Sequence, residues 1–452
     1  MNKQLVQKYN VPGPRYTSYP PVPAWSAEPS SPDELISKVK ESFSFTNQKR
    51  GISIYIHLPF CESLCTYCAC NTRITVNHAV EIPYIKALLA EWKLYLETFN
   101  ETPEIAEIHL GGGTPTFFQP ENLKILLDGI LTTSVIREDV EMGFEGHPNN
   151  TTAEHMQVLY DLGFRRVSFG IQDFDPIVQE KIHRVQSFEQ VNKVVNEARS
   201  IGYQSINFDL IYGLPFQTVN SIELTMNYVK QLNPDRIALY SYAHVPWVKT
   251  AHRSFSECDL PQGEYKRALY ELGKEKLTQN GYQEIGLDHF SLPTDDLFIA
   301  SQEGRLNRNF MGYTTSQSEL CIGLGVSSIG DTGSAYIQNI KTVEAYQERV
   351  SKGQFPFLKG HTLTRKELIA RRYITDLMCR FNTKIEEDIK EILSNDAKSN
   401  LQEMENDGLI KQSDKRIIIT EKGQPFVRNA CMAFDIHLKQ KSPSKEKYST
   451  VV

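Results

Sequence analysis

Residues 166–213 read RVSFGIQDFDPIVQEKIHRVQSFEQVNKVVNEARSIGYQSINFDLIYG, and this segment has the pattern of two strands joined by a helix. The runs at 166–172 and 205–213 are short and rich in β-branched and aromatic residues, which is typical of β-strands. Between them, residues 187–203 repeat apolar side chains at helical spacing. A strand, an amphipathic helix and a second strand in this order predict parallel strands joined by a right-handed crossover.

The same alternation extends from residue 51 to about residue 243. Further strand-like runs are ISIYIH (52–57), AEIHL (106–110), VEMGFE (140–145) and RIALYSYA (236–243). Amphipathic stretches such as residues 84–99 and 155–164 separate them. Six strand–helix units in a row predict an α/β fold of the (β/α)6 type, an incomplete TIM-type barrel, in preference to an open sheet.

Other regions surround the predicted barrel domain, to which we assign residues 46–355. Residues 1–45 are a predicted N-terminal arm over the active site, and the prolines and glycine of VPGPRYTSYPP (11–21) exclude a helix there. Residues 356–440 have a mainly helical pattern with one β-ribbon, which predicts a small, mainly α C-terminal domain. Residues 441–452 are predicted to be a flexible tail.

Chemically distinctive residues follow the predicted strands, one group after another. They are the cysteines of CESLCTYCAC (61–70), the segment GGGTPT (111–116), Glu145, Gln172, Asp209 and Ala243. In parallel α/β folds the loops at the carboxyl ends of the strands converge on one mouth, where sites are built. We therefore expect these groups to meet in one active site.

The segment CESLCTYCAC places four of the eight cysteines within ten residues. Closely spaced thiolates bind soft metals, which means zinc or an iron–sulfur cluster. Structural zinc usually takes two C-x2-C pairs, and the second pair is missing from this sequence. The spacing C-x3-C-x2-C suits three irons of a 4Fe–4S cluster, which leaves the fourth iron open to a ligand. An iron–sulfur cluster is therefore favoured over zinc.

The overall charge gives no indication of a nucleic-acid partner, because 49 Lys and Arg stand against 55 Asp and Glu, with a pI near 6.1. The N-terminus lacks the apolar core of a signal peptide, and no apolar run approaches membrane-spanning length. The remaining cysteines are far apart, and we expect them to be small buried side chains: Cys258, Cys321, Cys379 and Cys431. These features predict a cytoplasmic protein.

The cysteine motif and the GGGTP segment together resemble the signature of the radical S-adenosylmethionine superfamily. Nearly the whole sequence is similar to the oxygen-independent coproporphyrinogen III oxidase family. The segments that carry this resemblance are PGPRYTSYP (12–20), IHLPFCESLCTYCACN (56–71), SFGIQDF (168–174), DLIYGLPFQT (209–218), YAHVP (242–246), GLDHF (286–290), NFMGYTT (309–315), GLGVSSIG (323–330) and RNACMAFD (428–435).

The resemblance implies one 4Fe–4S cluster ligated by Cys61, Cys65 and Cys68, and two bound molecules of S-adenosylmethionine. The residues implied to contact the first molecule are Tyr55, Gly112 and Glu145. Those implied to contact the second are Tyr67, Gly113, Thr114, Gln172, Arg184, Asp209, Ala243 and Ile329. The residues implied to be catalytic are Tyr55, Cys70 and Phe310. Cys70 is not needed as a cluster ligand.

The resemblance also implies the reaction, in which two propionates of coproporphyrinogen III lose carbon dioxide and become vinyl groups, giving protoporphyrinogen IX without oxygen. A low-potential donor such as flavodoxin or ferredoxin would supply the electron, and the protein would be a monomer. Arg15, Tyr16 and Tyr19 in the arm are candidates for contact with the propionates. The alternative for the arm is a purely structural strap.

Four residues depart from the pattern of this family. Ala69 replaces a glycine, His147 replaces an aspartate, and Asn307 and Met311 replace the histidine and glutamine that flank R-N-F. Met311 exchanges an amide for a thioether beside the expected active site. Two alternatives therefore stay open: a radical S-adenosylmethionine enzyme acting on haem or another tetrapyrrole, and a non-catalytic haem-binding chaperone. The arm and Cys70 favour the oxidase over the chaperone.

Overall fold

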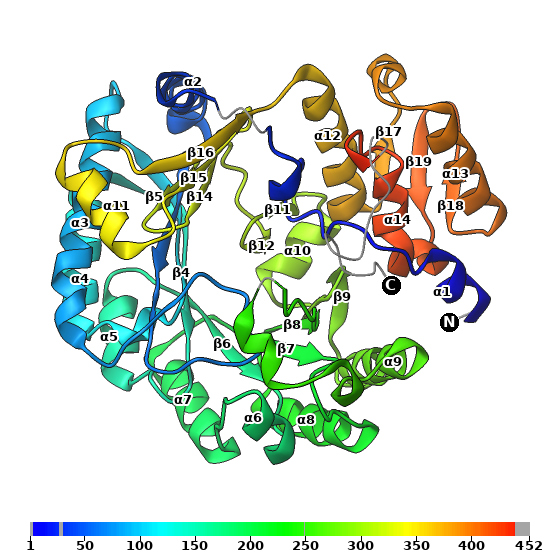
Figure 1. Cartoon of the computed structure of the whole chain (residues 1–452), viewed down its shortest axis with the longest axis horizontal. Helices are drawn as coiled ribbons and strands as arrows, with labels where there is room; N and C mark the ends of the chain where they lie inside the picture. Colours follow the sequence, from blue (N-terminus) through cyan, green and yellow to red (C-terminus); the bar gives the residue numbers. More distant parts are fainter. Residues whose placement is uncertain (1–2, 27–29, 248, 439–452) are drawn as a thin grey trace.

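The computed structural model describes residues 3–26, 30–247 and 249–438. Within these residues the largest element is a twelve-stranded sheet with the order β16-β15-β14-β13-β1-β4-β5-β6-β7-β8-β10-β9 (Figure 1). Its central strands run parallel. They are β13 (Cys321–Leu324), β1 (Ile52–Leu58), β4 (Glu104–Gly112), β5 (Val135–Gly146), β6 (Arg166–Gln172), β7 (Ser205–Tyr212) and β8 (Arg236–Ser241).

Antiparallel strands occupy both ends of the sheet. They are β14 (Ile329–Asp331), β15 (Ala335–Asn339) and β16 (Phe357–Thr362) at one end, and β10 (His289–Ser291) and β9 (Gln283–Gly286) at the other. The order ends at β16 and β9, so the described sheet curves without closing on itself. This arrangement confirms the predicted incomplete barrel.

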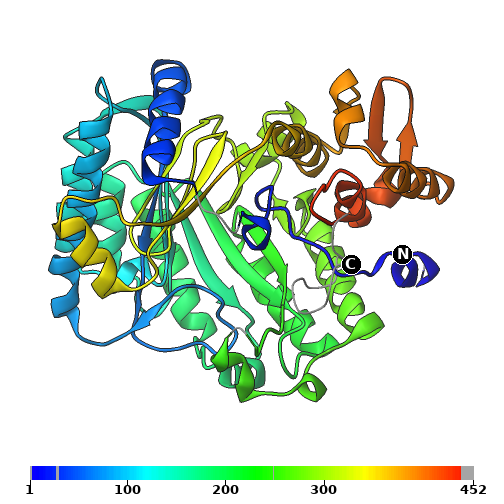
Figure 2. The same cartoon turned by 45° about the horizontal axis from the view of Figure 1, so that its top comes forward.

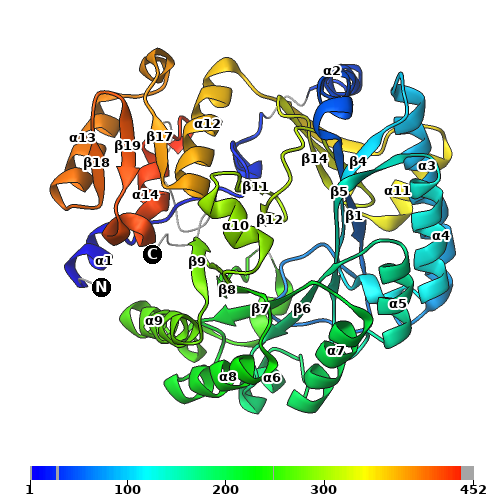
Figure 3. The same cartoon turned by 180° about the vertical axis from the view of Figure 1, so that it is seen from behind.

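Helices connect the parallel strands and cover the outer face of the curved sheet, as the view from behind shows (Figure 3). They are α3 (Glu81–Thr98), α4 (Pro120–Leu131), α5 (Ala153–Asp161), α6 (Pro176–Lys181), α7 (Phe188–Ile201), α8 (Val219–Leu232) and α9 (Gly263–Gln279). No helix within the described residues is long and apolar enough to cross a membrane.

Side chains along each strand point alternately into the apolar core and toward the inner face of the curved sheet. On β7, Ile206, Phe208 and Leu210 are buried in the main apolar core, whereas Asn207 and Asp209 project to the opposite side. Each fully buried aliphatic or aromatic side chain contributes about 1.5–3 kcal/mol to folding. The apolar set therefore fixes the register of the strand, and the polar set is directed inward as a consequence.

The C-terminal region forms a second buried apolar core. Its elements are α12 (Arg365–Arg380), β17 (Asn382–Lys384), α13 (Asn395–Asn406), β18 (Ile410–Gln412), β19 (Arg416–Ile419) and α14 (Val427–Met432). The predicted ribbon is present as β18 and β19, and β17 extends it to three strands in the order β17-β19-β18. The predicted tail at 441–452 lies outside the described residues.

The N-terminal segment runs from the C-terminal region to the barrel (Figure 2). It contains α1 (Lys3–Tyr9) and α2 (Pro32–Arg50), and the predicted boundary at residue 45 falls within α2. Residues 11–21 contain no helix, as the prolines and glycine predict. The hydroxyls of Tyr16 and Tyr19 both donate to the Asp435 carboxylate, at 3.0 and 3.2 Å.

A buried carboxylate on α3 secures the loop between β13 and β14. Glu91 is 0% exposed and accepts hydrogen bonds from the Gly325 backbone amide (2.8 Å), Asn339 (2.6 Å) and Tyr346 (2.6 Å). These partners lie in the β13–β14 loop, on β15 and on α11 (Val343–Ser351). Burial raises the pKa of Glu91 to about 7.

The raised pKa predicts a pH-dependent stability. Folded protein retains a proton on Glu91 that the unfolded chain releases at lower pH, so this contribution is present below pH ~4.5 and is lost as pH rises through about 7. At about 1.4 kcal/mol per pKa unit, the free energy of unfolding should fall by about 3 kcal/mol across this range. Urea titrations of the wild type and of Glu91→Gln at several pH values check this, because the substitution should flatten the dependence. An equal pH dependence of the free energy of unfolding in the two proteins would contradict this prediction.

Candidate active site

The cysteine loop begins where β1 ends and crosses the mouth of the barrel. A short parallel pair holds its base, formed by β2 (Phe60–Cys61) and β3 (Arg73–Ile74). Farther along, the Thr66 amide donates to the Ile182 carbonyl (3.0 Å) and the Thr66 hydroxyl to the Lys181 carbonyl (3.0 Å). The loop is thus attached at both ends before any ligand is considered.

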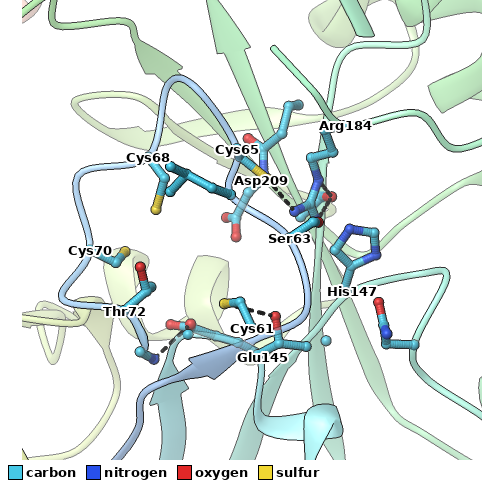
Figure 4. Close-up of a pocket in the computed structure, with 18 of the residues that line it drawn as sticks. Cys61, Ser63, Cys65, Cys68, Cys70, Thr72, Glu145, His147, Arg184 and Asp209 are labelled. Atoms are coloured by element: carbon cyan, nitrogen blue, oxygen red, sulfur yellow. Dashed lines mark hydrogen bonds between the residues drawn. The ribbon is translucent and has the colours of Figure 1, made fainter. Parts of the chain in front are cut away.

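All four thiols of the loop line one cavity of about 280 Å³ (Figure 4). Cys61, Cys65 and Cys68 are half-buried, Cys70 is exposed, and all four are free thiols. Among the described residues, no three His, Cys, Asp or Glu side chains are grouped so that they could hold one metal ion. Thiolates that each bind a different iron of a cluster need not converge on one point.

The thiols differ in their environments. Burial raises the pKa of Cys61 to about 11, and its Sγ lies 3.4 Å from the Thr114 hydroxyl. The hydrogen bond with Cys70 lowers the pKa of Cys68 to about 6 and raises that of Cys70. The Arg184 guanidinium lies 3.7 Å from Cys65 Sγ. The hydrogen bond with Thr114 and the charge of Arg184 act against the effect of burial on the pKa of Cys61, in the direction of the thiolate that metal ligation requires.

Two carboxylates, from strands on either side of β6, face the same cavity. Glu145 on β5 accepts from the Gly112 amide (3.2 Å) and lies 3.5 Å from His109 Nε2. Burial opposes ionisation of Glu145, but these two partners lower its pKa below the ordinary value. Burial and the charge of Glu145 raise the pKa of Asp209, on β7, to about 6. The cavity therefore presents one carboxylate that stays ionised and one that holds its proton more readily.

The glycines of GGGTP lie directly against the chain that leads into the cysteine loop. The Gly113 amide donates to the Leu58 carbonyl (2.8 Å), and a Cβ at Gly113 would lie 2.6 Å from the Pro59 carbonyl oxygen. Gly112 has φ of +112°, which favours glycine. We predicted close contact between these glycines and a ligand, and the structure adds a contact with the loop backbone.

A second cavity of about 470 Å³ adjoins the first and shares Cys70, Gly112 and Glu145 with it. It extends toward β14 and toward a hairpin made of β11 (Asn307–Asn309) and β12 (Gly312–Thr314). The predicted residues on its wall are Tyr55, Cys70, Gly112, Glu145, Phe310 and Ile329. The departing residue Met311 also lines it.

Comparisons with known proteins agree with this geometry. Residues 55–229 match the model of the Radical SAM superfamily. The chain is 40% identical over 441 residues to an oxygen-independent coproporphyrinogen III oxidase of Helicobacter pylori, covering 96% of each chain. It is 36% identical over 455 residues to the protein of that name from Escherichia coli, covering 99% of this chain and 98% of the relative.

The chain belongs to the oxygen-independent coproporphyrinogen III oxidase family. This confirms the resemblance predicted from the sequence. A solved structure of the Escherichia coli coproporphyrinogen III oxidase, described as a radical SAM enzyme, superposes with a TM-score of 0.88 at 34% identity. The superposition covers 97% of this chain and 99% of that one.

Most of the site residues predicted from the family lie on one of the two cavities. The first cavity brings together Cys61, Cys65, Tyr67, Cys68, Cys70, Gly112, Gly113, Thr114, Glu145, Gln172, Arg184 and Asp209. Ala243 follows β8 but is not among the residues that line either cavity. Asn307 also lies outside both linings, whereas His147 lines the first cavity.

Several site residues were not predicted from the sequence, although strand alternation marks some of them. Ser168 and Tyr240 line the first cavity, and His109 lies against Glu145. Ser168 donates to Asp209 (3.0 Å) from the adjacent strand β6. His109 lies two residues before Gly111 on β4, so the period of two could have assigned it to the inner face.

The contact at Gly113 predicts a specific sensitivity. Gly113→Ala places a methyl group against backbone atoms that cannot yield locally, so we expect a loss of about 1–3 kcal/mol in the free energy of unfolding. Gly143→Ala is the matched control, because a Cβ at Gly143 would meet its nearest atom at an ordinary 3.4 Å. Denaturant titrations of both variants check this, and equal stabilities would contradict it.

Proposed function

We propose that this protein is the S-adenosylmethionine-dependent enzyme that converts coproporphyrinogen III to protoporphyrinogen IX without oxygen in haem biosynthesis. In this reaction two propionates are oxidatively decarboxylated to vinyl groups. The observation that carries the proposal is one cavity lined by three thiols of a C-x3-C-x2-C loop, joined to a larger cavity that reaches the arm side of the barrel. Relatives that match nearly the whole chain carry the name of this activity.

Cys61, Cys65 and Cys68 hold a 4Fe–4S cluster in this proposal. When bound there together with S-adenosylmethionine, the cluster supplies the hydrogen-abstracting radical chemistry of the superfamily. The thiols present half-buried sulfur atoms to one cavity, which supports this assignment. Arg184 supplies positive charge next to Cys65 that offsets the charge of the thiolates.

The two cavities support a division of the cofactor contacts into two sets. Tyr55, Gly112 and Glu145, assigned to the first S-adenosylmethionine molecule, all line the second cavity, and Gly112 and Glu145 line the first cavity as well. Six of the residues assigned to the second molecule line the first cavity: Tyr67, Gly113, Thr114, Gln172, Arg184 and Asp209. Ile329 lines the second cavity instead, and Ala243 is peripheral to both.

The chemical types of these residues suit the groups of S-adenosylmethionine. Ionised Glu145 matches the methionine ammonium group, and the Arg184 guanidinium matches a carboxylate. Asp209 offers acceptors for ribose hydroxyls. Because Asp209 holds its proton more readily than a free aspartate, cofactor affinity should increase as pH rises through about 6.

Tyr55, Cys70 and Phe310 are the residues we assign to contact with the reacting tetrapyrrole, and all three line the second cavity. Burial raises the pKa of the Tyr55 phenol, and its hydroxyl lies 3.0 Å from His57 Nδ1. Tyr55 therefore stays protonated at neutral pH and can donate or transfer a proton. The low-potential electron donor, such as flavodoxin or ferredoxin, the monomeric state and the cytoplasmic location remain parts of the proposal.

Met311 gives a reason to keep a second candidate substrate. Its thioether lines the second cavity where the family has an amide, so the cavity loses a hydrogen-bonding group. A related tetrapyrrole or haem is the second candidate. A haem-binding chaperone without turnover is the third possibility. The following experiment distinguishes it from the two enzymes.

The function is tested under anaerobic conditions. Reconstituted protein receives a reductant, S-adenosylmethionine and coproporphyrinogen III, and chromatography measures 5′-deoxyadenosine and protoporphyrinogen IX. We expect both products. Cofactor cleavage without the vinyl product would favour another tetrapyrrole substrate, and the absence of both products together with haem binding would favour the chaperone.

The division of the four cysteines makes a separate prediction. Cys70→Ser should retain four irons per chain and the absorbance of the cluster, whereas serine at Cys61, Cys65 or Cys68 should lose most of the iron. Cys258→Ser is the control. The prediction that Cys258 is buried is wrong, because the structure exposes it, and it lies outside both cavity linings. Iron and sulfide analysis after anaerobic reconstitution provides the measurement. Loss of iron from the Cys70 variant would contradict the division.

A further inference from the structure

A small cavity of about 20 Å³ lies next to the second cavity and shares Asn309, Phe310 and Asp331 with it. Its other walls come from residues 16–19 of the arm, from β11 and from α12. A volume of this size accommodates about one water-sized group. The small cavity therefore extends the proposed substrate cavity toward the arm.

Arg308, on β11, lines the small cavity and precedes Asn309 and Phe310, which line both cavities. Its guanidinium carbon lies 4.5 Å from the centre of the Tyr313 ring, on the paired strand β12. Within the described residues, Nε and Nη1 of Arg308 are buried and have no hydrogen-bond partner. Arginine is always charged and its N–H groups only donate, so such burial without an acceptor costs stability and requires an explanation.

Other arginines in comparable surroundings are paired. Arg371 lines the same small cavity and donates to both oxygens of Asp331, at 3.1 and 2.5 Å. Arg236, which is buried, donates to Asp295 at 2.6 Å. Asp331 is the one carboxylate among the described residues that line the small cavity, and Arg371 engages both of its oxygens.

Arg308 is one of three arginines whose charge acts on the carboxyl group of Asp288. Burial raises the pKa of Asp288, and the charges of Arg15, Arg428 and Arg308 act in the opposite direction on the same carboxyl group. Arg15 and Arg428 come from the arm and from α14, and they donate to main-chain carbonyl oxygens at 2.6 and 2.7 Å. Arg308 therefore acts on Asp288 together with two other arginines, and the charge of Glu284 acts on Asp288 in the opposite direction.

We propose that Arg308 binds a propionate carboxylate of the tetrapyrrole substrate at the junction of the two cavities, an inference that rests on the proposed function. The carboxylate would supply the acceptor that the buried Nε or Nη1 lacks. Phe310 and Met311 follow in the same hairpin and line the second cavity, so a propionate held by Arg308 places the macrocycle against them. Arg308 then selects for a tetrapyrrole that carries a carboxylate at this position.

Two variants test this proposal in the reconstituted enzyme. Arg308→Gln should raise KM and the dissociation constant for coproporphyrinogen III by about 10- to 100-fold, as expected for the loss of a hydrogen bond to a charged group. Its cluster absorbance and S-adenosylmethionine affinity should not change. Its melting temperature without substrate should be equal to or higher than that of the wild type, because an unpaired buried charge is removed. Arg305→Gln is the control, since Arg305 is exposed and pairs with the nearby Glu303.

Monomethyl esters of the four propionates identify the carboxylate that Arg308 contacts. In the wild type, one of the four monoesters should bind more weakly than the free acid, and this loss of affinity should equal the loss that Arg308→Gln shows with the free acid. In the Arg308→Gln variant, the same monoester should bind as well as the free acid does. Arg308→Lys, which keeps the charge, should recover part of the affinity if the glutamine variant folds poorly. Unchanged substrate affinity in either folded variant, or additive losses for every ester, would overturn the inference and leave the proposed function intact. Failure of the wild type to convert coproporphyrinogen III would overturn both.

Discussion

Parallel pairing between β1 and β4 positions the two segments from which the site is built. The register runs from Ser53 opposite Glu107 to Leu58 opposite Gly112, so the cysteine loop and the GGGTP segment leave the sheet side by side. Backbone hydrogen bonds from Gly113 to Leu58 and from Thr114 to Phe60 continue this pairing past the end of the strands. A slip by one residue would turn the inner face of β1 outward and separate the thiols from Glu145.

Buried polar groups outside the cavities hold the walls of the site in place. Glu91 and Tyr84 on α3 bond to backbone amides at Gly325 and Val326, in the loop that leads to Ile329. Tyr84 also donates to the His57 carbonyl at the end of β1 (2.9 Å). One helix on the outer face thus connects two parts of the cavity wall that are far apart in the sequence. Arg308 contrasts with these groups because its Nε and Nη1 are buried and find no hydrogen-bond partner in the described part of the chain, which is why we assign it to a ligand.

Much of the fold and part of the site could be predicted from local patterns. Alternation in runs such as SINFDLIYG depends only on the neighbouring residues, and it predicts both the strand and the inward direction of Asp209. The position of Ala243 beside the site could not be predicted in this way, because the path of the chain after β8 depends on packing. Tyr16 and Tyr19 were candidates for contact with the propionates, with a structural strap as the alternative. In the structure their hydroxyls donate to Asp435, more than 400 residues away, as in a strap.

The sequence by itself determined the parallel α/β barrel, the four grouped thiols and the strand ends on which the polar residues lie, because strand periodicity and ligand spacing are local properties of the chain. Only the tertiary structure decided which side chains share a cavity, which cysteine is exposed, and which buried charges are paired. These properties depend on contacts between distant segments and on the free-energy cost of burying each charge. Such contacts alone decide that Arg371 pairs with Asp331 and that Nε and Nη1 of Arg308 have no hydrogen-bond partner among the residues that the structure describes.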